Sequence, residues 1–253
     1  TVYLDPLNAY RDYCFAPYQS SGIIALTLAS AVLHNTTLQN LAFRMIINYT
    51  NLYAGHHLST HAIYPNGTLD LITYYFSKED EDYANYMAAM ETFYYYYPQN
   101  TTVRSRIYEQ AWDGAQEMWN STGRCWNYKT DIRSGGLDLT SGPPYVAVHG
   151  FGMTDEVLLG AYLIFGNTTW RDRARQDFDS LVIQGKIMTH GLIDHSTYHP
   201  NVAQEGWNIH GRRTAVMLYN FFSNQTYLKW ANMLFWNVTG QMARKYGLAE
   251  AIS

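Results

Sequence analysis

The chain alternates between apolar helical stretches and short polar turns, and four of the turns share one pattern. Each contains an Asn-x-Thr triplet, and the four asparagines are Asn35, Asn100, Asn167 and Asn224. Counted from the Asn, positions +3, +7 and +11 are apolar in every copy; in the third copy they are Trp170, Ala174 and Phe178. Steps of three and four residues place these side chains on one face of a helix. A second apolar run precedes each Asn, so the pattern predicts helix, short turn and helix, four times over.

The repeats predict an all-α fold of repeated αα-hairpins, within a single domain over residues 1–253. The hairpins are expected at about residues 20–53, 79–119, 151–185 and 206–246, after an N-terminal arm over residues 1–19. In the fourth hairpin the first helix is expected to run from Arg212 to Phe222. At each short turn the Asn suits a left-handed conformation, and the Thr after it suits a helix N-cap.

The connections between the predicted helices alternate between short and long. Antiparallel hairpins with this alternation place the short turns at one end of the fold and the long loops at the other. Every histidine except His34 lies at the long-loop end, together with most of the glycine and proline and the loop tryptophans. Candidate chemistry is therefore expected at that end.

The composition excludes several function classes. The 253 residues are 47% hydrophobic and 15% charged, with a net charge of −4, so the chain is globular and offers no basic stripe to nucleic acid. Its longest aliphatic run, residues 22–33, is too short to span a membrane. The sequence has no HExxH zinc motif, P-loop or dinucleotide-binding glycine pattern, and we expect no metal and no cofactor.

Sequons for N-linked glycosylation are more frequent than chance predicts, because the chain has eight where about two are expected. They begin at Asn35, Asn48, Asn66, Asn100, Asn120, Asn167, Asn224 and Asn237. Turn and cap chemistry explains the four in the repeat turns but not the other four. The excess predicts a secreted, N-glycosylated extracellular protein. Since the chain begins at Thr1 without Met, we expect a leader peptide to have been removed.

The chain has two cysteines, Cys14 and Cys125. In an oxidising compartment they suit one disulfide, which would tie the N-terminal arm to the long loop after the second hairpin. Two buried thiols are the alternative interpretation.

Two stretches resemble hairpins of the six-hairpin (α/α toroid) glycosidases and of their lyase and epimerase relatives. They are HGFGMTDEVLLGAYLIFGNTTWRDRARQDFDSLV, residues 149–182, and GLIDHSTYHPNVAQEGWNIHGRRTAVMLYNFFSNQTYLKWANMLFWNVTG, residues 191–240. The resemblance lies in the repeat itself: an inner helix, a short turn and an outer helix, followed by a long loop with Trp, His and acids. With four hairpins where a closed ring has six, it implies an open arc or a partial toroid. It also implies carbohydrate as the partner and glycoside hydrolase or polysaccharide lyase activity.

Two acids are the candidate catalytic pair, because glycoside hydrolysis needs one protonated and one ionised carboxyl group. Glu205 is flanked by Trp207 and His210, and such surroundings suit sugar stacking and a raised carboxyl pKa. Asp155 holds the equivalent place at the start of an inner helix, after His149. The alternatives are a helix N-cap for Asp155 and a solvated loop acid for Glu205.

Aromatic, imidazole and guanidinium groups at the long-loop end are the candidate carbohydrate-binding residues. They are Trp126, His149, His195, Trp207, His210 and Arg212. In a lyase, Arg would neutralise a uronate while His or Tyr removes the α-proton. Alternatively, these histidines and the neighbouring tyrosines hydrogen-bond the loop backbone.

A non-enzymatic function is the second hypothesis. Twenty-three tyrosines and eight sequons on an open helical repeat suit a glycosylated structural protein of an extracellular filament or surface layer. Repeats with uncapped ends stack on further copies, so this hypothesis predicts self-assembly.

Overall fold

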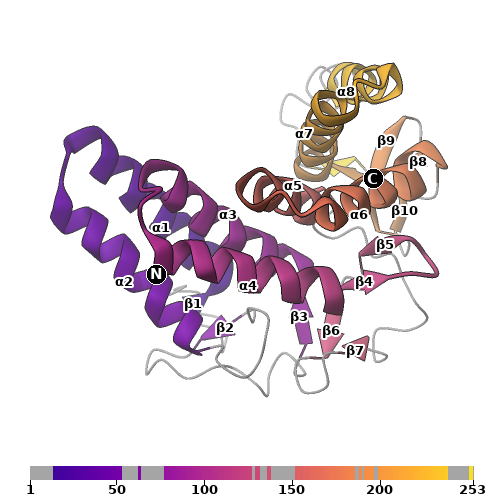
Figure 1. Cartoon of the computed structure of the whole chain (residues 1–253). Coiled ribbons are helices and arrows are strands. Elements are labelled where there is room, and N and C mark those ends of the chain that lie inside the picture. The colour runs from indigo at the N-terminus through magenta and orange to yellow at the C-terminus, as the bar shows by residue number, and fades with distance from the viewer. Residues whose placement is uncertain are drawn as a thin grey trace, which may run out of the picture. The chain divides into compact units, whose positions relative to one another are not determined.

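The computed structural model describes most of the predicted helices. The described residues are 14–52, 62–63, 77–126, 129–131, 136–137, 152–185, 188–189, 191–196, 199–238 and 251–252. They group into two compact units (Figure 1). The first unit consists of residues 1–117 and 129–138, and the second of residues 118–128 and 139–253. Whether all four hairpins form the expected single domain stays a prediction.

The first unit contains two αα-hairpins and short antiparallel strands. Its helices are α1 (Ala16–Leu33), α2 (Thr36–Leu52), α3 (Asp80–Tyr96) and α4 (Thr101–Glu117). Its strands are β1 (Cys14–Phe15), which pairs with β2 (Ala62–Ile63), and β3 (Ser77–Glu79), β6 (Lys129–Asp131) and β7 (Gly136–Leu137), which pair in the order β3-β6-β7. The inner helices α1 and α3 pack on each other and on their own outer helices.

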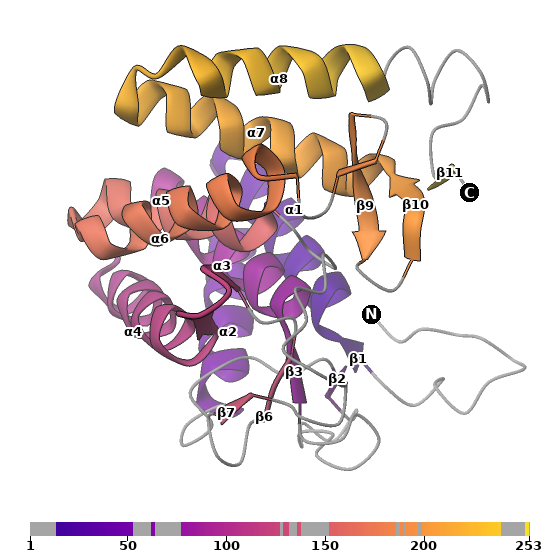
Figure 2. The same ribbon diagram turned by 90° about the vertical axis from the view of Figure 1, so that its right-hand side faces the viewer.

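The second unit repeats the arrangement with two further hairpins. Its helices are α5 (Met153–Phe165), α6 (Thr168–Phe178) with a π-helical turn η3 (Asp179–Ile183), α7 (Glu205–Phe222) and α8 (Gln225–Asn237). Its strands are β4 (Trp119–Asn120), β5 (Cys125–Trp126), β8 (Met188–Thr189), β9 (Leu192–Ser196), β10 (His199–Gln204) and β11 (Ala251–Ile252). Figure 2 shows α7 alongside α8, with their turn at one end and β9 and β10 at the other. The predicted separation of short turns from long loops is therefore present in this unit.

Each outer helix begins at the sequon Asn, which is itself the N-cap. The Asn35 Oδ1 accepts hydrogen bonds from the backbone N–H of Thr37 (2.9 Å) and Leu38 (3.1 Å). The other three turns repeat this geometry, with the donors Val103 for Asn100, Thr169 for Asn167 and Thr226 for Asn224. Each bond satisfies a backbone donor that the first helical turn leaves unpaired.

The N-cap and the left-handed residue each lie one position earlier in the chain than expected. The backbone at Asn224 is extended, with φ −89°, and not left-handed. The left-handed residue is the one before the Asn, as at His34 (φ 48°), Gly166 (φ 74°) and Ser223 (φ 52°). The Asn must be extended because an N-cap side chain reaches the N–H groups of the first turn only from that conformation.

The predicted apolar positions form the core of each unit. In the outer helices Ala42, Ile46, Val103, Ile107, Ala111, Trp170, Ala174, Phe178, Tyr227 and Ala231 are buried. The two exceptions are Leu38, which is half-buried, and Phe235, whose surface is 38% exposed. In the fourth hairpin, Phe235 has a cationic neighbour. The guanidinium of Arg212 lies 4.6 Å from its ring centre, so a cation–π contact partly covers it.

Buried tyrosines join the helices of the first unit. The Tyr86 hydroxyl donates to the carbonyl oxygen of Ile46 on α2 (2.8 Å), and the Tyr83 hydroxyl donates to that of Gln110 on α4 (3.1 Å). Gly114 is needed in α4 because a Cβ there would collide with the Tyr83 ring. These tyrosines bury their rings and still satisfy their hydroxyl groups.

The helices α1 and α7 begin earlier than the sequence predicts. Helix α1 begins at Ala16, within the expected arm, since a Pro such as Pro17 is tolerated in a first helical turn. Helix α7 begins at Glu205 and not at Arg212. Its early turns are fixed by Asn208, which bonds both backbone groups of Ile193 on β9, so a tertiary contact outweighs the weak helix propensity of two nearby glycines.

Three other expectations can be compared with the structure only where its residues are described. Among the described residues no disulfide is seen; Cys125 is buried, the side chain of Cys14 lies outside them, and the pairing stays a prediction. Residues 1–13 of the arm and 239–250 of the fourth hairpin also lie outside the described residues. No helix within the described ranges is long and apolar enough to cross a membrane.

We expect the Asn cap to contribute measurably to stability. Asn224→Ala removes the acceptor and should lower the free energy of unfolding by about 1 kcal/mol. Asn224→Asp keeps a side-chain oxygen in place and should stay within about 0.5 kcal/mol of the wild type. Urea denaturation followed by circular dichroism measures both variants. Equal losses in the two variants would contradict the capping role.

Candidate functional site

The beginnings of α5 and α7 lie against each other in the second unit. Gly152 precedes α5 with φ 81°, and a Cβ at this residue would collide with the backbone of His210 and Gly211 on α7. The Thr214 hydroxyl donates to the Gly152 carbonyl oxygen (3.2 Å). Only glycine combines this left-handed backbone with so close an approach. The contact brings the acids at the start of α5 to the side chains of α7.

Glu156 and His210 form the accessible part of the candidate site. The Nδ1 of His210 lies 3.0 Å from the Oε1 of Glu156, and the two side chains are 21% and 19% exposed. The guanidinium of Arg213 is 3.8 Å from the other oxygen of Glu156. The carboxylate therefore orients the imidazole ring through its Nδ1.

Asp155 lies beside this pair in sequence but is completely buried. Its Oδ1 accepts a hydrogen bond from the Trp126 indole N–H (2.8 Å). Burial raises the pKa of the Asp155 carboxyl well above its usual value, and the negative charge of Asp177 raises it further. The Trp126 hydrogen bond lowers that pKa, but by less. Burial and the neighbouring acid therefore both favour the protonated form of Asp155.

Hydrogen bonds to Asp177 and from Ser180 connect the β4–β5 hairpin to α6 and η3. The Asp177 Oδ1 accepts the backbone N–H of Trp126 (3.0 Å), and the Ser180 hydroxyl of η3 donates to the Gly123 carbonyl oxygen (2.9 Å). The rings of Trp119 and Trp126 pack edge to face, with their centres 4.8 Å apart. Asp177 thus positions the backbone of Trp126, and Asp155 accepts a hydrogen bond from its indole N–H.

The structure places the predicted site residues in three different situations. Trp126, Asp155 and His210 come together around the start of α5. Arg212 is exposed and contacts Phe235 of α8, so it turns to a different helix from Arg213. His149 and the side chains of His195, Glu205 and Trp207 lie outside the described residues. Their roles stay predictions.

The described backbone corrects the alternative interpretations of the two acids. Asp155 does not cap α5, since Gly152 is the N-cap and Asp155 is the third helical residue. Glu205 is not a loop acid, since it is the first residue of α7. Trp126, expected to bind sugar, is 5% exposed and its indole N–H bonds Asp155; its contact with a sugar stays a prediction.

Two residues of the candidate site, Glu156 and Asp177, were not predicted from the sequence. Asp177 lies three residues after Ala174 and next to Phe178, both on the buried face of α6. A charged residue on a predicted core face is the signal that identifies it. Glu156 follows a candidate acid directly, but its pairing with His210 joins residues 54 apart and cannot be read from spacing.

Carboxyl and imidazole groups do not gather into a metal site in the described part of the chain. No group of three or more His, Cys, Asp and Glu side chains there is arranged to hold a metal ion.

Comparison with known proteins finds relatives in structure alone. No family model and no curated protein matches the chain. Cellobiose 2-epimerase from Bacillus thermoamylovorans superposes on 97% of this chain and 66% of its own, with 10% identity and a TM-score of 0.78. A family 76 glycoside hydrolase (mannosidase) from Bacteroides thetaiotaomicron superposes on 99% of this chain and 68% of its own, with 13% identity and a TM-score of 0.68.

A third solved structure is an inactive variant of an α-1,6-mannanase from a Salegentibacter species, in complex with α-1,6-mannotriose. Two consecutive aspartates are replaced by asparagine in it. It superposes on 87% of this chain and 61% of its own, with 12% identity and a TM-score of 0.59. The chain thus spans about two thirds of the length of these structures. The likeness confirms the predicted fold class of repeated αα-hairpins of the α/α-toroid type.

The raised pKa of Asp155 predicts a pH-dependent stability. The folded chain holds this proton more tightly than the unfolded chain, where the pKa of Asp is about 3.9. The free energy of unfolding should therefore fall as the pH rises from about 4 towards the raised pKa. Asp155→Asn should remove that fall, because its amide still accepts the Trp126 bond and can donate to Asp177.

Urea denaturation at a series of pH values tests this expectation. Asp172→Asn, which changes a more exposed acid on α6, is the matched control and should keep the wild-type profile. If Asp155→Asn instead shows the wild-type profile, Asp155 is ionised in the folded protein.

Proposed function

We propose that this chain acts on carbohydrate and that its chemistry takes place where α5 and α7 begin. The observation that carries the proposal is the contact between Glu156 and His210, beside the buried Asp155. A carboxylate that orients an imidazole is a proton-transfer pair. Its place in an αα-hairpin repeat similar to sugar epimerases and mannosidases supports a sugar as the ligand.

The acids at the start of α5 give the proposal a second support. In the α-1,6-mannanase, the inactive variant has two consecutive aspartates replaced. This chain also has two consecutive acids, Asp155 and Glu156, in the first turn of an inner helix. The likeness concerns residue type and succession only.

Each residue has a separate role in the proposed chemistry. In this proposal His210 exchanges a proton with a sugar hydroxyl or a glycosidic oxygen, and Glu156 orients its ring. Asp155, one of the two acids predicted to be catalytic, is a positioning residue in this proposal, because its carboxyl is fully buried and accepts the indole N–H of Trp126. Glu205, at the beginning of α7, is the candidate second carboxyl group that glycoside hydrolysis requires.

The reaction type is proposed to be that of a glycoside hydrolase or a polysaccharide lyase. Incubation with a panel of oligosaccharides and uronate-containing polysaccharides distinguishes the two. Hydrolysis releases new reducing ends, whereas elimination produces an unsaturated sugar that absorbs ultraviolet light. Exchange of a sugar C–H proton with deuterated solvent, without cleavage, would instead indicate an epimerase.

Glu156→Gln should lower the turnover of a processed sugar by roughly 10²- to 10⁴-fold, the usual effect of losing a general acid–base group. The glutamine still bonds His210, so stability should change by no more than about 1 kcal/mol. Glu109→Gln, the same change at an exposed acid on α4, is the control and should keep full activity. Equal turnover by the wild type, Glu156→Gln and Glu109→Gln would show that Glu156 has no part in the mechanism.

Glu205→Gln tests the predicted second carboxyl group separately. Turnover should be abolished while stability stays within about 1 kcal/mol of the wild type. An unchanged rate would exclude Glu205 without affecting the proposal for Glu156. If no sugar is processed and the native protein forms ordered polymers, the structural hypothesis replaces the enzymatic one.

We also propose that the protein is a secreted glycoprotein, on the support of its eight sequons. Intact mass before and after enzymatic deglycosylation should differ by the mass of several glycans. A mass equal to that of the bare chain in both samples would contradict the proposal.

A further inference from the structure

The turn between α1 and α2 borders a pocket of about 420 Å³ in the first unit. His34, Asn35 and Gln39 line it from the turn and α2, and Tyr96 and Tyr97 line it from the end of α3. The Tyr97 hydroxyl lies 2.6 Å from that of Ser30, which joins α3 to α1 beside the pocket. Its volume is within the range of small-ligand sites, and polar groups alternate with aromatic rings around it.

Asn35 is one of the residues that line this pocket. Its Oδ1 accepts from two backbone N–H groups of α2, and two donors can face only the oxygen, so the orientation of the amide is fixed. No described residue is seen to accept a hydrogen bond from the Asn35 Nδ2. The residue is exposed, and Asn35-Thr36-Thr37 is a sequon.

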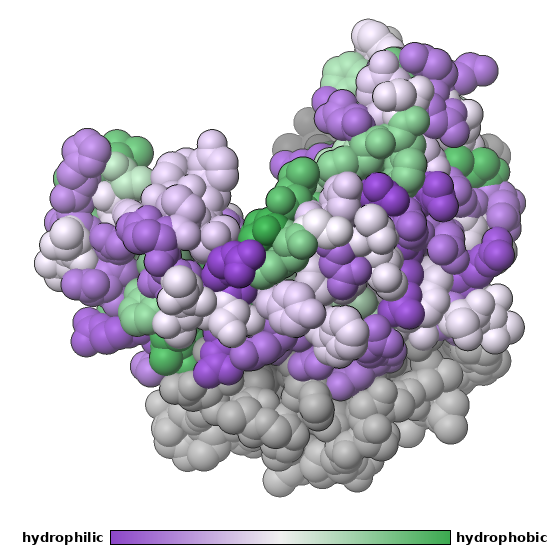
Figure 3. All heavy atoms as spheres, viewed as in Figure 1, coloured by the Kyte–Doolittle hydropathy of each residue, from purple (hydrophilic) through white to green (hydrophobic). Residues whose placement is uncertain are grey.

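We propose that Asn35 carries an N-linked glycan and that its first N-acetylhexosamine packs into this pocket against Tyr96. The ring of Tyr96 is 42% exposed, and a tyrosine offers an apolar face to the C–H side of a sugar. Gln39 and His34 lie where they can bond the hydroxyl and acetamido groups. The exposed Val32 and Leu33 lie beside the turn, where Figure 3 shows a hydrophobic patch among hydrophilic surroundings. This inference rests on the proposed glycosylation.

The attachment step needs a pyrophosphate-linked oligosaccharide as donor. The Asn35 Nδ2 forms a bond to the anomeric carbon of the sugar while the bond from that carbon to the pyrophosphate oxygen breaks. The electron pair of the broken bond leaves with the pyrophosphate, and the amide nitrogen loses one proton to a base. The Oδ1 takes no part, so the cap hydrogen bonds are kept.

A different sequon shows that this geometry is not general. The Nδ2 of Asn237 donates to the Gly191 carbonyl oxygen (2.7 Å), and a Cβ on Gly191 would collide with it. The amide nitrogen of Asn237 is therefore hydrogen-bonded within the second unit, whereas Asn35 uses its side-chain oxygen for the cap and lines a pocket.

The test uses full-length protein secreted from a eukaryotic host. An endoglycosidase trims each glycan to one N-acetylglucosamine, and glycopeptide mass spectrometry measures the occupancy of Asn35. Hydrogen exchange of the first turn of α2 is then compared with that of Thr37→Ala, which removes the sequon but keeps the Asn35 cap. Exchange should be slower in the glycosylated protein by roughly two- to tenfold, the range of one aromatic contact.

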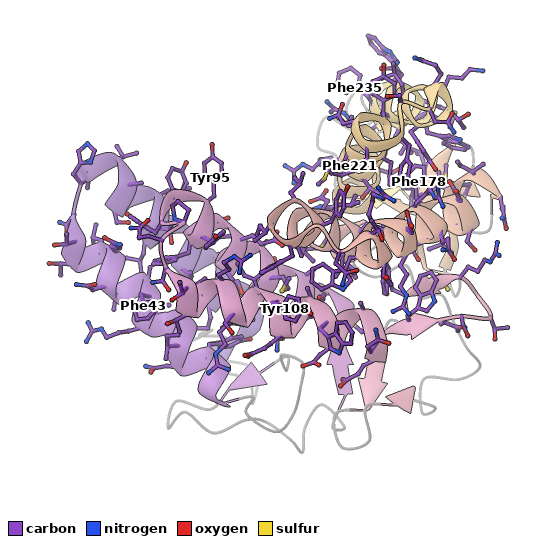
Figure 4. All side chains as sticks on the ribbon, viewed as in Figure 1. Phe43, Tyr95, Tyr108, Phe178, Phe221 and Phe235 are labelled. Carbon is purple, nitrogen blue, oxygen red and sulfur yellow. The ribbon has the colours of Figure 1, made fainter. Side chains whose placement is uncertain are left out.

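Substitution of single tyrosines tests whether the ring of Tyr96 contacts the sugar. Tyr96→Ala should abolish the protection, and Tyr96→Phe should keep it. Tyr108→Ala is the matched control, because Tyr108 is also 42% exposed and lies on α4 (Figure 4), where it does not line the pocket. It should leave the protection unchanged.

Three outcomes would overturn the inference. The first is an unmodified Asn35 in protein whose other sequons carry glycans, which leaves the proposed glycoprotein intact. The second is equal protection in the wild type and in Tyr96→Ala. The third is slower exchange of the same amides when free N-acetylglucosamine is added to Thr37→Ala, since the pocket would then be a site for an external sugar. A chain with no glycan at all would refute the glycoprotein proposal itself.

Discussion

A hydrogen bond from a backbone N–H to an asparagine side chain begins every outer helix described in this protein. The oxygen of Asn35 makes two such bonds, and the three later turns repeat the geometry. Because the cap fixes where the helix begins, it also fixes which residues face inward at +3, +7 and +11. The core of each unit therefore depends on two asparagine side chains, one at the start of each of its outer helices.

Much of the fold follows from the sequence, because a hairpin is encoded locally. The periodicity and the turns identify all four hairpins, and burial of residues such as Trp170 and Ala174 confirms them. The early beginning of α7 does not follow, since it depends on the amide of Asn208 bonding a strand 15 residues away. The roles of the candidate site residues stay predictions. The structure shows Trp126 bonded to Asp155 and His210 bonded to Glu156, and these contacts join distant segments, so the spacing of residues along the chain does not reveal them.

The two consecutive acids of α5 illustrate how one helical turn can separate two chemical states. Neighbouring helical side chains point about 100° apart, so Asp155 faces the interior and Glu156 faces α7. Burial and the charge of Asp177 raise the pKa of the first acid, while the second contacts an imidazole and an arginine near the surface. A buried carboxyl group thus lies next in sequence to one that reaches solvent, and each can be altered without removing the other.

The asparagine side chains differ in what the fold would lose if their amide groups were hydrolysed to carboxylates. At Asn224 the change to aspartate keeps the oxygen that accepts the backbone bond and adds a negative charge at the positive end of the helix dipole. At Asn237 the same change removes the donor to the Gly191 carbonyl and leaves two acceptors facing each other. Hydrolysis would therefore weaken the end of α8 while leaving its first turn capped.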